Sequence, residues 1–535
     1  MRNVLDDDNN KLEVIRYKNE NMSNRQIAKM LGISRSSVDD FVNKKSYTSF
    51  WESYDNGKPI ASGVLHSPEL DRQTLIGKRF VFTSAQNNTY VFKEFLESLE
   101  TYCEYNDAEL IVGTYTYNLN GFQNSTKDSD DIWFDPLITP YINDNSAVVA
   151  KGLIWCGELN ILPTAVNPLS GLHSYTKSDS GIVPHAKLRL ESIPTHKQKP
   201  CKFLYTTGTI TKRNYIEKKE GQKASFHHVY SALVAEIDDD GDWFVRQLVS
   251  DGDGSFYDLD KKYDGKTVID GVSVEAINWG DIHAEQEDPI VSNISWGNNP
   301  DSILNTLNPK YQFVHDLIDF SSRNHHSISD PYFLFTRWKT GNESVKDNMI
   351  KSAATLVDMQ RDNCQLVVVE SNHDLAFVRW LKNADYKNDP VNAIFFLESQ
   401  LAQYQAMDKG NYDFSVFEHT LKKILPQISN VVFLRTDESF LICGEDGIEC
   451  GQHGHLGNNG ARGSINSYQK LGTRYNLGHS HACAIVDGVY VAGVSAKLDL
   501  GYNKGGSSWS HSHIVTYPNS KRTIITIKNG KKWRA

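Results

Sequence analysis

Apolar residues recur at helical spacing in two short runs near the N-terminus, between residues 22 and 42. Gly32 separates the runs and permits a tight turn, and Ser34 is placed to cap the second run by accepting from its first turn. The apolar positions that would pack together are Ile27, Ala28, Leu31, Ile33, Val38, Phe41 and Val42. The pattern therefore predicts a small all-α domain over residues 1–50.

This spacing resembles the helix-turn-helix of DNA-binding proteins, in which the second helix enters the major groove. The resemblance implies that Arg35, Ser36 and Ser37 would lie near the DNA. Asp39 and Asp40 fall on the same helix, and their negative charge opposes tight binding to a polyanion. A helical packing module without a DNA partner is the alternative.

The pattern changes after the N-terminal helices. Residues 51–77 contain a stretch rich in Gly, Pro and Ser and are predicted to form a linker. Beyond them the apolar positions predict a strand over 79–83, a helix over 90–105 and a strand over 109–113. We therefore expect a middle α/β domain over residues 78–268.

From residue 272 onward, five apolar runs are each followed at once by residues of metal-ligand type. The runs lead into Asp281 and His283, into Asp316, into Asn372 and His373, into His453, and into His479 and His481. In a layered α/β architecture the carboxyl ends of strands converge on one edge, where binding sites are built. We therefore expect these carboxylate, amide and imidazole groups to surround one pocket.

The ordered set resembles the calcineurin-like metallophosphoesterases, whose signature runs D-x-H, G-D-x-x-D, G-N-H-[DE], H and G-H-x-H. The resemblance covers residues 269–535 and implies a layered α/β fold, a β-sandwich flanked by helices. Between the third and fourth motifs the sequence predicts a helical insertion around residues 384–427. His315 and Ser371 stand where the family usually has glycine, which affects loop geometry rather than any ligand.

The resemblance implies two divalent metal ions and assigns their ligands. Asp281, His283 and His481 would hold one ion, Asn372, His453 and His479 would hold the second, and Asp316 would bridge both. His455 is an alternative to His453 at the second ion. Mixed oxygen and nitrogen donors suit borderline divalent ions such as manganese, iron or zinc, and we expect Mn²⁺, with Fe²⁺, Zn²⁺ and Mg²⁺ as alternatives.

Such a centre would hydrolyse phosphoesters by in-line attack of a metal-activated hydroxide. By the same resemblance His373 would contact the phosphate and protonate the leaving oxygen, with Asp374 orienting its ring. Arg323, His326 and Arg462 could contact phosphate oxygens. For Arg323 and His326, surface positions on a helix are an equal alternative.

Charge and composition refine this picture. The net charge of −10 over 535 residues argues, taken alone, against a nucleic-acid partner. The charge is uneven, however, because residues 11–45 carry eight Lys/Arg against four Asp/Glu and residues 451–535 carry eleven against two. With seven cysteines but no C-x-x-C pair, no signal peptide and no membrane-spanning apolar run, we expect a reduced, cytoplasmic protein without a membrane partner.

These observations favour a two-metal deoxyribonuclease that hydrolyses DNA phosphodiester bonds. The full arrangement also resembles phage-encoded pre-early nucleases that degrade host DNA, which would place the protein in the host bacterial cytoplasm. Two alternatives are a phosphoesterase acting on small-molecule or protein phosphoesters, and a DNA-binding regulator with an inactive phosphoesterase fold. Oligomeric state, including a homo-oligomer, is left open.

Overall fold

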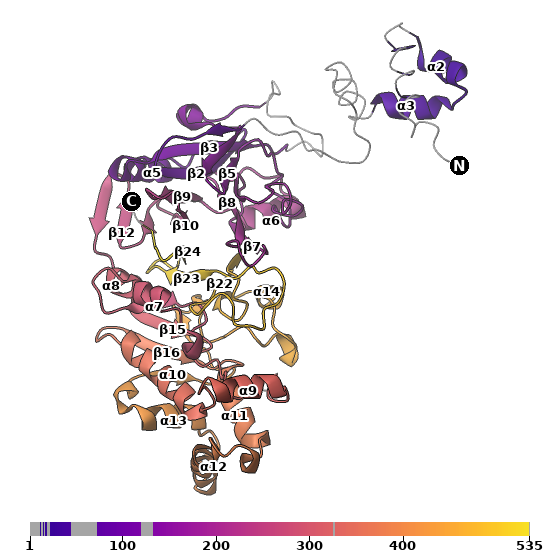
Figure 1. The fold of residues 1–535 in the computed structure, drawn as a ribbon. Coiled ribbons are helices and arrows are strands. Elements are labelled where there is room, and N and C mark those ends of the chain that lie inside the picture. Colours follow the sequence, from indigo (N-terminus) through magenta and orange to yellow (C-terminus); the bar gives the residue numbers. More distant parts are fainter. Residues whose placement is uncertain are drawn as a thin grey trace. The chain divides into compact units, whose positions relative to one another are not determined.

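The computed structural model describes residues 11, 14, 17–18, 22–43, 72–118, 132–324 and 327–533. Contacts divide the chain into two compact units, Met1–Leu70 and Asp71–Ala535, and the boundary expected near residue 268 lies inside the second unit. The chain is a mixed α/β protein with several sheets (Figure 1). None of the described helices is long and apolar enough to cross a bilayer.

Two helices, α2 (Asn24–Leu31) and α3 (Arg35–Asn43), are described in the N-terminal unit. A capping box between Ser23 and Gln26 starts α2, and Gly32 ends it with a φ of 66°. As predicted, the Ser34 hydroxyl accepts a hydrogen bond from the amide of Ser37, at 3.0 Å. The buried core of the unit consists of Val14, Ile27, Ala28, Val38 and Phe41.

The larger unit contains a four-stranded sheet in the order β10-β9-β2-β3. Its strands are β2 (Arg79–Gln86), β3 (Glu109–Tyr115), β9 (Ser231–Ile237) and β10 (Trp243–Val249). Helix α5 (Lys93–Asn106) connects the parallel strands β2 and β3, in agreement with the strand–helix–strand pattern of the sequence. Phe95 and Leu99 of α5 are fully buried against this sheet.

An 11-stranded sheet has the order β1-β4-β5-β6-β8-β7-β21-β22-β20-β19-β18. Its strands are β1 (Gln73–Thr74), β4 (Ser146–Ala150), β5 (Leu153–Cys156), β6 (Ser180–Val183), β7 (Arg189–Ile193), β8 (Lys202–Thr206), β18 (Leu441–Ile442), β19 (Ile448–Glu449), β20 (Arg474–Leu477), β21 (Ala484–Val486) and β22 (Val489–Val491). Antiparallel pairing of β7 with β21 places Leu190 opposite Ile485. Strands from both sides of residue 268 therefore share one sheet.

A six-stranded sheet has the order β17-β16-β15-β14-β23-β24. Its strands are β14 (Ala276–Asn278), β15 (Tyr311–Val314), β16 (Gln365–Val369), β17 (Val432–Leu434), β23 (His511–Thr516) and β24 (Arg522–Ile527). Strands β14 to β17 are parallel, so their carboxyl ends lie at one edge. One face buries Phe313 and Val367 against Ile442 and Ile448 of the 11-stranded sheet.

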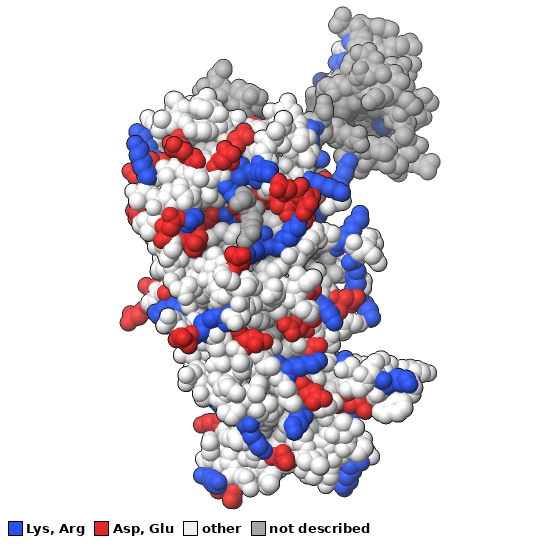
Figure 2. Space-filling model, turned by 60° about the vertical axis from the view of Figure 1, so that its left-hand side comes forward, with Lys and Arg blue, Asp and Glu red and all other residues white. Residues whose placement is uncertain are grey.

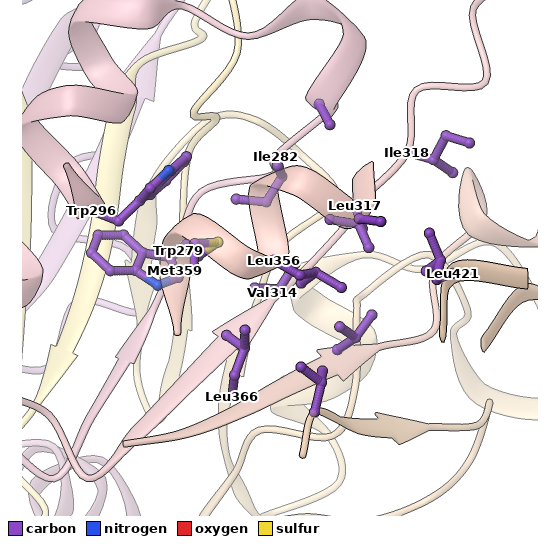
Figure 3. Packing of buried hydrophobic residues seen from close by; sticks show 14 of the residues in the cluster. Trp279, Ile282, Trp296, Val314, Leu317, Ile318, Leu356, Met359, Leu366 and Leu421 are labelled. Atoms are coloured by element: carbon purple, nitrogen blue, oxygen red, sulfur yellow. The ribbon is translucent and has the colours of Figure 1, made fainter. Parts of the chain in front are cut away.

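Helices cover the other face of the six-stranded sheet (Figure 3). They are α7 (Pro289–Trp296), α8 (Ile303–Leu307), α10 (Val345–Met359), α11 (Asp374–Asn383) and α13 (Val416–Ile424). Leu356 of α10 and Leu366 of β16 are buried in this layer, and the Trp279 ring packs edge-on against Trp296 with centroids 5.4 Å apart. The layer fixes the strands whose ends carry the motif residues.

The segment at 384–427, where helices were expected, contains α12 (Ala393–Asp408) and α13 between short 3-10 turns. These helices lie at the far end of the larger unit from β2 and β3 (Figure 1). Further helices and strands are α6 (Lys219–Phe226), α9 (Pro331–Lys339), α14 (Ile465–Gln469) and the three-stranded sheet of β11 (Phe256–Asp258), β12 (Lys261–Asp264) and β13 (Thr267–Asp270).

Candidate metal centre

The motif residues meet where strands of both large sheets end. Asp281 and His283 follow β14, Asp316 follows β15, Asn372 and His373 follow β16, His453 follows β19, and His479 and His481 follow β20. Among the described residues, three groups of His and Asp side chains have donor atoms that lie within 4.8 Å of one another. All the predicted ligands except Asn372 belong to these groups, and Asn372 contacts one of them.

The first group consists of Asp281, His283, Asp316 and His481, all buried. His481 Nε2 lies 3.0 Å from Asp281 Oδ2 and 3.0 Å from His283 Nε2. Two imidazoles and two carboxylates therefore direct donor atoms at one small volume.

The second group consists of Asp316, His453 and His479. His453 Nε2 lies 3.3 Å from Asp316 Oδ2 and 3.1 Å from Asn372 Oδ1, so the amide oxygen joins this group. Asp316 belongs to both groups, which is the position that a bridging ligand would take.

The third group places Asp319 between His283 and His373. Asp319 Oδ1 lies 3.2 Å from His283 Nδ1 and 3.7 Å from His373 Nδ1, and its backbone carbonyl is 3.0 Å from His373 Nδ1. The sequence pattern gave Asp319 no role, yet it holds both rings.

Asp374 does not take the role that the family resemblance implied. Its carboxylate accepts hydrogen bonds from the Ser371 hydroxyl at 2.8 Å and from the Ile318 amide at 3.2 Å. Asp374 therefore ties the loop after β16 to the loop after β15, and Asp319 orients the His373 ring instead. Burial, followed by repulsion from Asp316, raises the pKa of Asp374 to about 7.

The pKa values of the two histidines in the second group shift in opposite directions. Burial alone would lower the pKa of His453, but the charges of Asp316 and Asp281 raise it to about 9. Burial and the neighbouring His453 lower the pKa of His479 to about 4. Because a metal ligand must be a neutral imidazole, His479 is in the binding form at neutral pH, whereas a metal would displace a proton from His453.

The donor set fits a divalent cation. Asp281 Oδ1 is fully buried and has no hydrogen-bond partner in the described structure, although its other oxygen accepts from the His479 amide at 2.7 Å. An unpaired buried carboxylate oxygen is unfavourable unless a cation or a donor reaches it. Carboxylate, amide and imidazole donors are the ligands of borderline divalent metals. These buried His and Asp groups could therefore hold a metal ion.

Four of the predicted ligands have left-handed backbone conformations. The φ angles of His283, Asp316, His479 and His481 are 43°, 43°, 71° and 57°. Such conformations are strained in residues with side chains and persist where the surrounding structure fixes them, mainly at functional sites. Left-handed backbone therefore occurs at four of the motif residues, although other described residues outside the motif, such as Asn88 and Phe320, share it.

Comparison with known proteins gives two matches. Residues 8–47 match the CENP-B N-terminal DNA-binding domain. Over 483 residues the chain is also 42% identical to Protein A1 of Escherichia phage T5. The aligned region makes up 89% of this chain and 86% of that protein. The chain belongs to the protein A1 family. No solved structure matches it.

The domain match in this A1-family chain supports DNA as a partner of the N-terminal helices. Arg35 and Ser36 are exposed in the first turn of α3, where the resemblance to a helix-turn-helix implied DNA contacts. Arg35 Nε lies 3.4 Å from Asp39 Oδ2, so one of the acids noted in the sequence pairs with the basic residue beside it.

The other three residues expected to contact phosphate in this A1-family chain are Arg323, His326 and Arg462. Arg323 is buried and forms two hydrogen bonds of 2.7 Å to the carboxylate of Asp389, so its guanidinium is already paired, and its contact with phosphate stays a prediction. His326 lies outside the described residues. Arg462 is exposed and stays a prediction.

Glu285 also supports the site of this A1-family chain, and the sequence motifs do not include it. Glu285 accepts hydrogen bonds from the amides of Asp319 at 2.6 Å and Phe320 at 2.9 Å, so it fixes the loop after β15. Burial and the nearby Asp319 raise the pKa of Glu285 to about 8. Glu285 follows His283 by two positions, and nothing in that spacing predicts that its carboxylate would accept from the backbone of a distant loop.

Proposed function

We propose that this A1-family protein is a two-metal deoxyribonuclease with a calcineurin-like metallophosphoesterase fold. The observation that carries the proposal is the pair of donor groups that share Asp316. They contain the motif residues in their predicted division: Asp281, His283 and His481 in one, His453 and His479 in the other. A shared carboxylate between two sets of mixed donors is the arrangement used to hold two ions in phosphoester hydrolysis.

We propose Mn²⁺ as the bound ion, with Fe²⁺, Zn²⁺ and Mg²⁺ as alternatives, since carboxylate, amide and imidazole donors together accept ions of this class. When bound, the divalent ions would supply Lewis acidity, which activates water and offsets negative charge on the phosphate oxygens.

His373 is the side chain we assign to proton transfer. Its side chain is 17% exposed, so it can reach a substrate, whereas the ligand His283 is fully buried. The Asp319 carbonyl accepts from Nδ1, which leaves Nε2 free to hold the proton for the leaving oxygen. Asp319 thereby positions the ring, and Asp316 holds the backbone of His373 by accepting from its amide at 3.3 Å.

The N-terminal domain match favours DNA over a small-molecule substrate. A separate DNA-binding unit raises the effective concentration of a polymeric substrate, which a small phosphoester does not need. The similarity to a phage protein supports a role during infection. We propose degradation of host DNA as that role.

A panel of metals and substrates tests the function. Purified protein should cut duplex or single-stranded DNA with Mn²⁺, lose this activity with a chelator, and turn over para-nitrophenyl phosphate poorly. Asp316→Ala should reduce cleavage by more than about 100-fold, because loss of a residue that only supports a ligand already costs roughly 10–100-fold. The exposed Asp362→Ala is the matched control and should match wild type.

Each alternative has its own signature in this panel. Rapid turnover of para-nitrophenyl phosphate without DNA cleavage would favour a small-molecule or protein phosphoesterase. A well-folded sample with no metal by elemental analysis and no cleavage under any condition would favour an inactive DNA-binding regulator.

A further inference from the structure

Five aromatic side chains form a closed circuit at the candidate metal centre. The ring centroids of His283 and His481 are 4.9 Å apart, and those of His481 and Trp509 are 4.2 Å apart. Trp509 and Tyr502 follow at 5.9 Å, Tyr502 and His373 at 6.4 Å, and His373 and His283 close the circuit at 4.7 Å. Three of the five are predicted ligands or the proton donor, while Tyr502 and Trp509 have no role in the chemistry proposed so far.

Tyr502 is the member of the circuit that faces solvent. Its side chain is 49% exposed, whereas His283 and His481 are buried and Trp509 is partly buried. The centroid of its ring lies 6.4 Å from that of His373, which places the ring beside the predicted proton donor. An exposed tyrosine ring beside a buried cluster of ligands can contact a substrate bound there.

The loop that carries Tyr502 is held in place on both sides. Thr195 and Ser507 exchange two backbone hydrogen bonds, of 3.0 and 2.8 Å. Lys197 Nζ lies 2.8 Å from Asp499 Oδ1. Between these points the Asn503 side chain accepts from the Leu500 amide at 3.2 Å and donates to the Leu498 carbonyl at 2.9 Å. The ring is thus presented by an anchored loop, which reduces the entropy lost when a ligand stacks on it.

Positive charge accompanies the aromatic ring. Lys497 and Lys504 are exposed on the same loop, and Arg379 reaches the Asn372 carbonyl beside the second donor group, at 2.6 Å. Aromatic rings interleaved with basic residues form the surface that binds single-stranded nucleic acid, because bases stack and phosphates pair with the cations.

We propose that Tyr502 stacks on an unpaired nucleobase next to the scissile phosphate, and that the enzyme therefore prefers single-stranded or frayed DNA to continuous duplex. The inference rests on the proposed nuclease function. The ring centroids of Tyr502 and His373 are 6.4 Å apart, so one nucleotide can reach both side chains, with its base on the exposed tyrosine ring and its phosphate at His373. Within a duplex both faces of a base are already stacked, and only an unpaired base can offer one to Tyr502.

Two variants and a matched pair of chromogenic substrates test this inference. Thymidine 5′-(para-nitrophenyl) phosphate carries a base, and methyl para-nitrophenyl phosphate has the same leaving group without one. For Tyr502→Ala we expect KM for the thymidine ester to rise roughly tenfold, within the range that loss of a stacking aromatic produces, and KM for the methyl ester to stay unchanged. Tyr502→Phe should match wild type for both, because the ring is kept.

The same variants are compared on one oligonucleotide, alone and annealed to its complement. Wild type should cleave the single strand faster, and Tyr502→Ala should remove most of that preference while metal content and melting temperature stay unchanged. Equal KM values for wild type and Tyr502→Ala would overturn the inference. A defect in Tyr502→Phe as large as in Tyr502→Ala would also overturn it, because the hydroxyl would then be the contact. Absence of metal-dependent cleavage of any phosphodiester by wild type would instead refute the nuclease function itself.

Discussion

Gly478, at the end of β20, lies directly against Asp281, a predicted metal ligand. A Cβ atom added there would meet Asp281 Oδ1 at 2.2 Å and His315 Cβ at 3.1 Å. Asp281 is fully buried, and its other oxygen accepts from the His479 amide. Its carboxylate therefore cannot rotate away from an added Cβ without leaving the first donor group. The close approach of backbone to carboxylate thus depends on the absence of a side chain at this position.

We predict that Gly478→Ala lowers metal content and DNA cleavage together by at least about tenfold, since a displaced ligand weakens the site as much as loss of its support does. Elemental analysis after dialysis against trace Mn²⁺ measures the first quantity. Gly252→Ala is the control, because no atom lies within 4 Å of its added Cβ. Full metal content in Gly478→Ala would contradict the proposed place of Asp281 in the site.

Residue types in the motifs were enough to predict which side chains meet, but not how each is supported. Asp281, Asp316 and His453 come together because each follows a strand end, which the apolar runs indicated. That Asp319 rather than Asp374 holds His373 depends on loop backbone geometry. Tyr502 lies in a stretch that reads only as a turn, so its approach to the site could not be predicted from spacing.

At the scale of elements, the helical insertion stabilises the loop that follows Asp316, the predicted bridging ligand. Arg323 is 7% exposed, and its guanidinium forms two hydrogen bonds to Asp389, which lies at the start of the insertion. Asp389 also accepts from Asn392, whose side-chain oxygen accepts from the first amide of α10, at Val345. The sequence could not indicate this pairing, because Asp389 lies 66 residues from Arg323 in a segment without a recognised motif.

We predict that Asp389→Ala lowers the free energy of unfolding by about 1.5–3 kcal/mol, because the buried Arg323 guanidinium loses two charge-assisted hydrogen bonds and keeps only Glu343, at 3.6 Å, as a carboxylate partner. Urea unfolding followed by circular dichroism measures this change. The exposed pair Lys423–Glu398, with a separation of 3.7 Å, is the control, and Lys423→Ala should cost less than about 1 kcal/mol. If Arg323→Ala lost cleavage activity at unchanged stability, Arg323 would be a phosphate contact after all.

At the scale of the whole molecule, net charge and sequence order were poor guides to organisation. The face shown in Figure 2 has basic and acidic side chains interspersed, so the charge of −10 does not describe that face. Apolar runs predicted individual strands correctly, but not that β7 would pair with β21 across the boundary expected at residue 268. Such non-local pairing depends on which short strand edges are left open, and local patterns do not record it.

The shared sheet decides where the chain can be divided. Residues 71–535 form one compact unit, so this fragment should fold, bind metal and cleave short oligonucleotides at the wild-type rate. It should bind long DNA more weakly and with a shallower salt dependence than the full chain, because it lacks the matched DNA-binding segment at residues 8–47.

A division at residue 268 should instead fail, because it separates β7 from β21 and removes Gln247 from its hydrogen bonds with Thr523 and Ile524. We predict that residues 269–535 expressed alone aggregate or lack a cooperative thermal transition, since the split exposes the edge of β21 and the apolar face beneath it. Melting followed by circular dichroism, with the 71–535 fragment as control, distinguishes the two divisions. A cooperative transition and native metal content in 269–535 would mean that the C-terminal segment is an independent domain, and that the shared sheet joins two units which fold separately.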